Sequence, residues 1–154
     1  IYRKTSANAD FRKLKEVKAN STSYTDKSGT GAKTYYYAVR AYRNVDGKKV
    51  SGAYTTSKVT TKPATVKASA KAVKAKQVKV TWKNIAGESG YTVMRKTAKG
   101  KWKTIANVKA NKVSYVDKTA KKGTKYYYAV KAYKNVSGKK LYGKAGTTKL
   151  IKAK

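Results

Sequence analysis

The sequence predicts an all-β fold, built as two consecutive β-sandwich units. Short segments with alternating apolar and polar residues recur along the chain, and turn signals separate them about every ten residues, which is typical of sandwiches. The pattern is also duplicated, because the tyrosine triplet 35–37 returns as triplet 126–128, 91 residues later. A repeat of this length is too long for a solenoid unit and suits small independent domains.

The clearest predicted strands contain these two tyrosine triplets, at residues 32–42 and 123–133. In the second, Tyr128, Val130 and Ala132 point to one side. Tyr127, Ala129, Lys131 and Tyr133 point to the other. A strand that is apolar on one side and carries Lys and Tyr on the other is expected to be half-buried.

The remaining elements follow in order around these strands. In the first copy we expect strands at residues 11–17, 23–26 and 50–60, and in the second copy at residues 65–70, 77–82, 91–96, 102–108, 114–117 and 141–151. Asp46-Gly47 and Ser137-Gly138 predict hairpin turns, in which Gly supplies a positive φ. Pro63, the only proline, marks the boundary between domains 1–62 and 63–154.

The second copy resembles a fibronectin type III domain. The resemblance depends on four motifs: Val78-x-Val80-x-Trp82, Gly90-Tyr91-x-Val93-x-Arg95, Tyr115-x-Asp117, and Gly123-Thr124-x-Tyr126-x-Tyr128-x-Val130-x-Ala132. It implies that Trp82 packs in the core and that the hydroxyls of Tyr126 and Tyr35 reach back to backbone. The Lys-rich modules look most like repeats in surface or secreted proteins of Gram-positive bacteria. Lys122 and Ala120 depart from the family pattern before the Gly-Thr turn, and an Arg-Gly-Asp motif is absent.

The first copy corresponds to a module without its first two strands. We expect the inner side of Tyr37 and Val39 to be uncovered as a result, with an unpaired sheet edge. Ile1 falls inside a strand-like pattern, which indicates a longer parent chain with other domains. Either residues upstream of Ile1 or strands from another chain would complete the module.

Charge is the second conspicuous property of the sequence. Lys and Arg number 39 against six acids, which gives a net charge of +33. An AT-rich genome favours Lys codons, but it also favours Glu codons, and only Glu16 and Glu88 occur. We therefore interpret the charge as functional. Because it is carried mostly by Lys, it suits diffuse attraction to a polyanion more than bidentate recognition.

The residues needed for most catalysis are missing. The sequence has no His and no Cys, so the usual metal ligands, general base and thiol nucleophile are absent. The few acids are scattered, and we expect Asp26 and Asp117 to bond turn amides. The sequence therefore predicts no enzyme, no cofactor and no metal site. No apolar run approaches the roughly 18 residues of a membrane-spanning helix.

The best local candidate for a ligand site is the outward side of the triple-tyrosine strands. In the second copy it comprises Tyr127, Lys131, Tyr133, Met94 and Lys96, and in the first Tyr36, Arg40 and Tyr42, beside Tyr2 and Lys4. Rings interleaved with cations could hold an anionic glycan, teichoic acid or single-stranded nucleic acid. The alternative is that these residues are stabilising cross-strand pairs that bind nothing.

Together these observations predict a non-catalytic spacer and adhesion module. We expect it to be secreted or attached to the cell wall and to bind an anionic wall polymer or acidic glycan. A non-specific nucleic-acid binder of an extracellular matrix and a subunit of a self-assembling surface filament are the alternatives.

Overall fold

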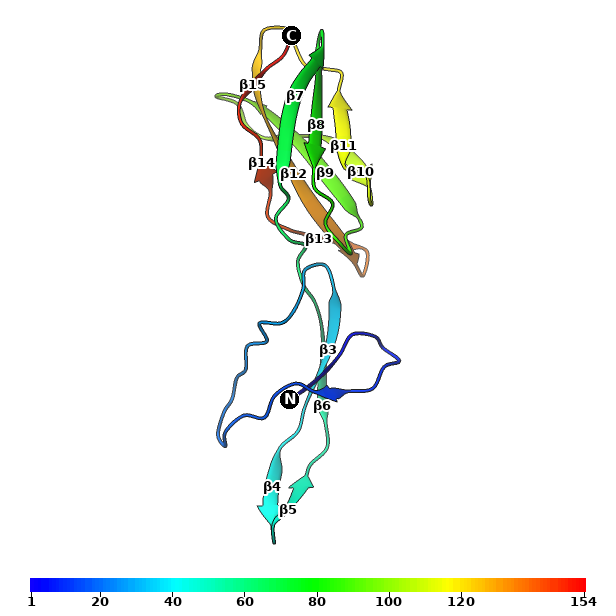
Figure 1. Cartoon of the computed structure of the whole chain (residues 1–154), viewed down its shortest axis with the longest axis vertical. Helices are drawn as coiled ribbons and strands as arrows, with labels where there is room; N and C mark the ends of the chain where they lie inside the picture. The colour runs from blue at the N-terminus through cyan, green and yellow to red at the C-terminus, as the bar shows by residue number, and fades with distance from the viewer. The chain divides into compact units, whose positions relative to one another are not determined.

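The computed structural model describes all residues from Ile1 to Lys154 and contains strands but no helix (Figure 1). The chain divides into two compact units, Ile1–Thr61 and Lys62–Lys154. The predicted all-β class is therefore confirmed. No helix is long and apolar enough to cross a membrane.

The C-terminal unit consists of two sheets. One is three-stranded, in the order β11-β8-β7, with bounds Ser114–Asp117, Gln77–Trp82 and Ala68–Lys74. The other follows the order β10-β9-β12-β13, with bounds Lys103–Lys109, Gly90–Thr97, Lys125–Val136 and Lys139–Tyr142. Two short strands, β14 (Gly146–Thr147) and β15 (Ile151–Lys152), also pair with β12.

The core of this unit is the one that the alternating patterns predict. Val78, Val80 and Trp82 from β8 meet tyrosine and valine side chains from β12. Tyr126, Tyr128 and Val130 are buried in the same cluster. The corner tyrosines are confirmed as well, because the backbone N–H groups of Lys121 and Thr30 donate to the hydroxyls of Tyr126 and Tyr35 at 3.2 and 2.8 Å.

The N-terminal unit has one four-stranded sheet in the order β2-β1-β3-β6. The strands span Arg12–Lys13, Tyr2–Lys4, Thr34–Val39 and Thr55–Thr60. A separate hairpin pairs β4 (Tyr42–Val45) with β5 (Lys48–Ser51). Its turn places Asp46 and Gly47 at φ values of 48° and 73°, as the Asp-Gly dipeptide predicts.

No counterpart of β7 and β8 covers the inner side of this sheet. Val39 is 51% exposed, whereas Val130, at the same position of the repeat, is 0% exposed. A groove of about 480 Å³ lies there instead, lined by Val39, Tyr37, Val17 and Tyr24 among others. The expectation that the first module lacks two strands and has an uncovered inner side is confirmed.

Several predicted strands of the N-terminal unit differ from the observed ones, because a strand forms only where a neighbouring strand pairs with it. Residues 23–26 form no strand, because their counterpart β11 pairs only with β8, and this unit has no such partner. The strand expected at 11–17 is reduced to β2. The strand expected at 50–60 is interrupted, because β5 pairs with β4 and β6 pairs with β3.

In the C-terminal unit the differences are smaller. The opening strand begins at Ala68 rather than at residue 65, since its ladder with β8 starts opposite Trp82. The closing segment expected at 141–151 is divided into β13, β14 and β15.

Candidate functional site

On the outward side of the C-terminal unit, aromatic rings alternate with a lysine. Tyr127 of β12 is the register partner of Lys96 of β9. The Lys96 Nζ lies 5.4 Å from the centre of the Tyr127 ring and 5.5 Å from that of Trp102. At such distances a ring attracts a cation, worth about 0.5–1 kcal/mol at an exposed site. We call this arrangement a ring–lysine row.

The N-terminal unit has a ring–lysine row at the same place in its repeat. Lys4 lies 4.7 Å from the Phe11 ring centre and 5.7 Å from the Tyr36 ring centre. Lys58, the register partner of Tyr36 on β6, lies 5.6 Å from the Tyr36 ring centre. This row therefore runs across β1, β3 and β6, with rings and cations in alternation.

The other expected members of this side lie near the rows. Met94 is the partner of Ala129 and is half-buried, and Lys131 approaches the Tyr142 ring at 5.9 Å. In the N-terminal unit the Arg40 guanidinium lies 5.1 Å from the Tyr2 ring and donates to the Tyr2 hydroxyl at 2.8 Å. The structure thus brings Tyr36, Arg40, Tyr127, Lys96, Lys131 and Met94 to the outward sides of their units.

Tyr133 and Tyr42 require a correction. Tyr133 is only 8% exposed, because Tyr142 packs against its ring at 5.9 Å and the Lys140 Nζ covers it at 4.2 Å. Its ring is therefore not open to a ligand. Tyr42 is exposed but belongs to the β4–β5 hairpin rather than to the sheet.

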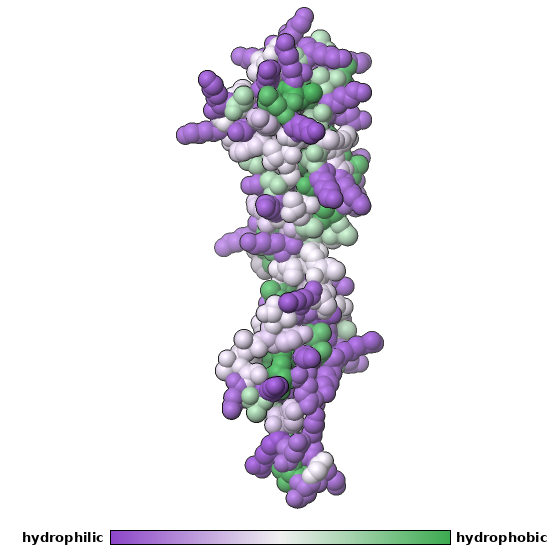
Figure 2. Space-filling model, turned by 60° about the vertical axis from the view of Figure 1, so that its left-hand side comes forward, coloured by the Kyte–Doolittle hydropathy of each residue, from purple (hydrophilic) through white to green (hydrophobic).

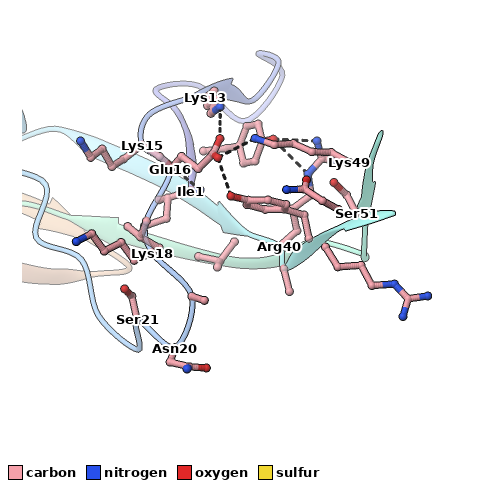
Figure 3. A pocket seen from close by; sticks show the side chains of 18 residues that line it. Ile1, Lys13, Lys15, Glu16, Lys18, Asn20, Ser21, Arg40, Lys49 and Ser51 are labelled. Atoms are coloured by element: carbon pink, nitrogen blue, oxygen red, sulfur yellow. Dashed lines mark hydrogen bonds and ion pairs between the residues drawn. The ribbon is translucent and has the colours of Figure 1, made fainter. Parts of the chain in front are cut away.

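Tyr42 instead belongs to a cluster around Glu16, at the wall of a groove of about 740 Å³ (Figure 3). The Glu16 carboxylate accepts hydrogen bonds from Lys13, Lys49 and Tyr42 at 2.6, 2.7 and 2.7 Å. These three donors, led by Lys13, lower the pKa of Glu16 to about 2. The acid is thus ionised and fully engaged, which makes it unsuited to proton transfer near neutral pH.

Each unit also contains a buried carboxylate network that the sequence patterns did not indicate. Asp117 is 0% exposed and accepts from Arg95 at 2.6 Å, from Tyr128 at 2.8 Å and from the Thr119 N–H and hydroxyl at 2.9 and 2.8 Å. Burial acts to raise its pKa, but the hydrogen bonds from Thr119, Tyr128 and Arg95 outweigh burial, so the pKa of Asp117 lies below its usual value.

The same network recurs around Asp26. It accepts from Arg3 at 2.6 Å, from Tyr37 at 2.7 Å and from the Ser28 N–H and hydroxyl at 2.8 and 2.7 Å. The expected turn bonds of Asp26 and Asp117 are confirmed, but they are one part of a larger structural link. The sequence did contain a signal for this network, because its Arg, Asp and Tyr residues recur at the same positions in both copies of the repeat.

Charge is unequally divided between the units. The N-terminal unit holds 13 Lys and Arg against four acids, and the C-terminal unit 26 against two. Both acids of the C-terminal unit, Glu88 and Asp117, are buried at 8% and 0% exposure. Its surface therefore exposes cations without any acidic side chain, and Figure 2 shows long hydrophilic side chains projecting from the face in view.

Comparison with known proteins identifies the fold. No protein-family model and no curated protein matches the sequence. Among solved structures, the chain is similar to a segment of two fibronectin type III domains from chicken tenascin, with a TM-score of 0.60 and 16% identity over 79% of this chain and 65% of that chain. It is also similar to the FN1–FN3 domains of chicken CNTN1, with a TM-score of 0.51 and 18% identity over 99% of this chain and 52% of that chain.

The fold is that of tandem fibronectin type III domains. An Fn3-like protein from Clostridium thermocellum is 28% identical over 56% of this chain and 88% of that chain, with a TM-score of 0.42. The chain spans about two thirds of the tenascin segment and about half of the CNTN1 segment.

Proposed function

We propose that this chain is a non-catalytic spacer and adhesion module that works outside the cell, bound to an anionic wall polymer such as teichoic acid, or to an acidic glycan. The observation that carries the proposal is the surface of the C-terminal unit. It holds 26 Lys and Arg, and both of its acids are buried. Such a surface repels other cations and draws in polyanions.

Lysine rather than arginine dominates this surface, and lysine is better suited to binding a flexible polymeric ligand. An ammonium group is a point charge on a flexible stem, whereas a guanidinium group matches one planar partner in a fixed geometry. Four of the five arginines lie in the N-terminal unit, and the fifth, Arg95, is engaged with buried Asp117. The cations available to a ligand in the C-terminal unit are therefore lysines.

The test is a binding titration of the full chain against purified teichoic acid, an acidic glycan, a neutral glycan and duplex DNA, over a range of salt concentrations. We expect binding to the first two that weakens linearly in log–log form as salt rises, and no binding to the neutral glycan. Binding to duplex DNA that is much tighter, with a slope of about −0.9 per phosphate contact, would favour the nucleic-acid function instead. Absence of polyanion binding at physiological salt would refute the proposal.

Self-assembly is a second candidate, favoured by the uncovered inner side of the N-terminal unit, where Val39 is 51% exposed. A strand from a second copy would bury that side and pair with the free sheet edge. Light scattering after size exclusion tests this function. A mass that stays monomeric at the highest soluble concentration would exclude a filament.

A further inference from the structure

The outward side of the three-stranded sheet β11-β8-β7 has an ordered arrangement of hydroxyls and lysines. Thr81 of β8 lies between Ser114 of β11 and Ser69 of β7 in the strand register. The Ser69 and Thr81 hydroxyl oxygens are 2.9 Å apart and hydrogen-bonded. These three residues form a row of hydroxyls across the sheet.

Pairs of lysines flank this row on both sides along the strands. Lys79 is the direct register partner of Lys71, and Lys83 lies opposite Lys67, where its N–H donates to the Lys67 carbonyl at 3.2 Å. All four lysines are exposed. Since residues two apart along a strand are separated by about 7 Å, the two lysine pairs lie about 14 Å apart with the hydroxyls between them. We call these residues the hydroxyl–lysine face.

Like charges directly opposite each other destabilise a sheet, so these pairs need an explanation. In the N-terminal unit, Lys13 and Lys49 share the carboxylate of Glu16. The C-terminal unit has no exposed acid that could act in this way, because Glu88 and Asp117 are buried and already engaged. The paired lysines therefore have no acidic partner within their own unit and are open to an anionic ligand.

Protection of a sheet edge does not explain the arrangement. Lysines on an edge strand prevent pairing with other chains, and this would account for Lys71 on β7 and for Lys67 directly before it. Lys79 lies on β8, which is the central strand of the sheet, and Lys83 directly follows that strand. A central strand needs no such protection.

We propose that the hydroxyl–lysine face binds a linear polymer that carries repeated tetrahedral oxyanions. A single polymer chain would lie on the sheet and run parallel to β8. Each lysine pair would hold one oxyanion between two ammonium groups, and the Ser69 and Thr81 hydroxyls would contact the segment between them. The inference rests on the proposed function, and it replaces diffuse attraction by a defined surface on one unit. The oxyanion could come from a phosphodiester polymer or from a sulfated glycan.

The test compares two triple variants of the full chain with equal net charge. K71Q/K79Q/K83Q removes lysines from the face, and K99Q/K122Q/K139Q removes exposed lysines from loops and a hairpin elsewhere on the same unit. Binding of polyglycerol phosphate and of heparin is measured against salt. The variant disturbs the contacts to two oxyanions, so it should lower the log–log salt slope by about 1.4, at about 0.7 per anionic group of a single-stranded polymer, and hence weaken binding about 25-fold at 0.1 M salt.

The outcomes separate this inference from the proposed function. We expect the face variant to lose binding as stated and the control variant to lose less than about threefold. An equal loss in both variants would refute the face and leave diffuse attraction in place, while failure of the wild-type chain to bind either polymer would refute both. If only polyglycerol phosphate responds to the face variant, the oxyanion is a phosphodiester, and if only heparin responds, it is a sulfate.

Folding of the variants is checked by a readout that is independent of binding. Removing a like charge from the Lys71–Lys79 pair should stabilise the sheet rather than weaken it. The face variant should therefore unfold at a denaturant concentration equal to or higher than that of the wild type. Weaker binding together with higher stability would show that the lost affinity is not caused by unfolding.

Discussion

The buried carboxylate networks allow one perturbation to be made in both units of the same molecule. Tyr128→Phe deletes the hydroxyl that donates to Asp117 at 2.8 Å, and Tyr37→Phe deletes the hydroxyl that donates to Asp26 at 2.7 Å. Both substitutions remove a tyrosine hydroxyl that donates to an aspartate, and the two tyrosines occupy the same position of the repeat. The surroundings differ, because Tyr128 is fully buried and Tyr37 borders the uncovered groove.

The expected magnitudes follow from this difference. A hydrogen bond to a charged group is worth about 1.5–3 kcal/mol when its loss leaves the partner buried and unsatisfied. Asp117 is 0% exposed, so Tyr128→Phe should cost the C-terminal unit that amount. Water can reach the site near Tyr37 and replace the lost donor, so Tyr37→Phe should cost less than about 1 kcal/mol.

Tryptophan fluorescence during urea unfolding of the full chain is a suitable assay. Trp82 and Trp102, the two tryptophans, both belong to the C-terminal unit. The fluorescence transition should therefore move to lower urea for Tyr128→Phe and stay in place for Tyr37→Phe. A Tyr128→Phe variant that unfolds like the wild type would refute the view that the network holds the C-terminal unit together.

Three further predictions follow from other contacts. Because the pKa of Asp117 is lowered in the folded state, its contribution to the stability of the C-terminal unit is complete above the unfolded-state pKa of about 3.9 and declines as pH falls below it; unfolding of this unit, followed by tryptophan fluorescence across acidic pH, should show this decline, and the decline should be absent in Asp117→Asn. Lys79→Gln should raise the stability of the C-terminal unit by about 0.2–1 kcal/mol at low salt, with a smaller gain when thermal unfolding is repeated at high salt. Gly146→Ala should cost about 1–3 kcal/mol, because a Cβ there would overlap the Val66 carbonyl oxygen; unchanged urea unfolding of this variant would contradict that packing.

Much of the C-terminal unit could be predicted from the sequence because its signals are local. Val78, Val80 and Trp82 alternate with polar residues over six consecutive positions, which are the bounds of β8. Period-two alternation identifies the buried side of a strand without knowledge of its neighbours. The bonds of the corner tyrosines were predicted from the resemblance to fibronectin type III domains, and each joins a tyrosine hydroxyl to a backbone N–H five residues away.

The predictions from sequence were wrong where a strand or an exposed side chain depends on a neighbour that is distant in the sequence. Residues 23–26 have the composition of a strand, but no strand lies beside them to accept their hydrogen bonds. Tyr133 alternates as an outward residue, yet Tyr142 of β13 covers it. Alternation gives the direction of a side chain, and it does not reveal what the neighbouring strand places on top.

The candidate ligand side was only partly predictable for a related reason. Tyr127 and Lys96 meet as expected, because both lie at outward positions of paired strands. The hydroxyl–lysine face was not found from the sequence, since Ala-rich and Lys-rich strands such as β7 have a weak strand signal. Only the register of β7 against β8 reveals that their lysines stand opposite each other.

The duplication also indicates that the lysine excess is not a requirement of the fold. The N-terminal unit exposes Asp10, Glu16 and Asp46, and the corresponding positions of the C-terminal unit hold Lys101, Asn107 and Ser137. The acid shared by both units is the one in the buried network, Asp26 and Asp117. Packing therefore explains the acid that both units have, and it gives no reason for the absence of the other three. The lack of acids at positions where the same fold accepts them therefore supports the proposed binding of a polyanion, because an acid there would repel such a ligand.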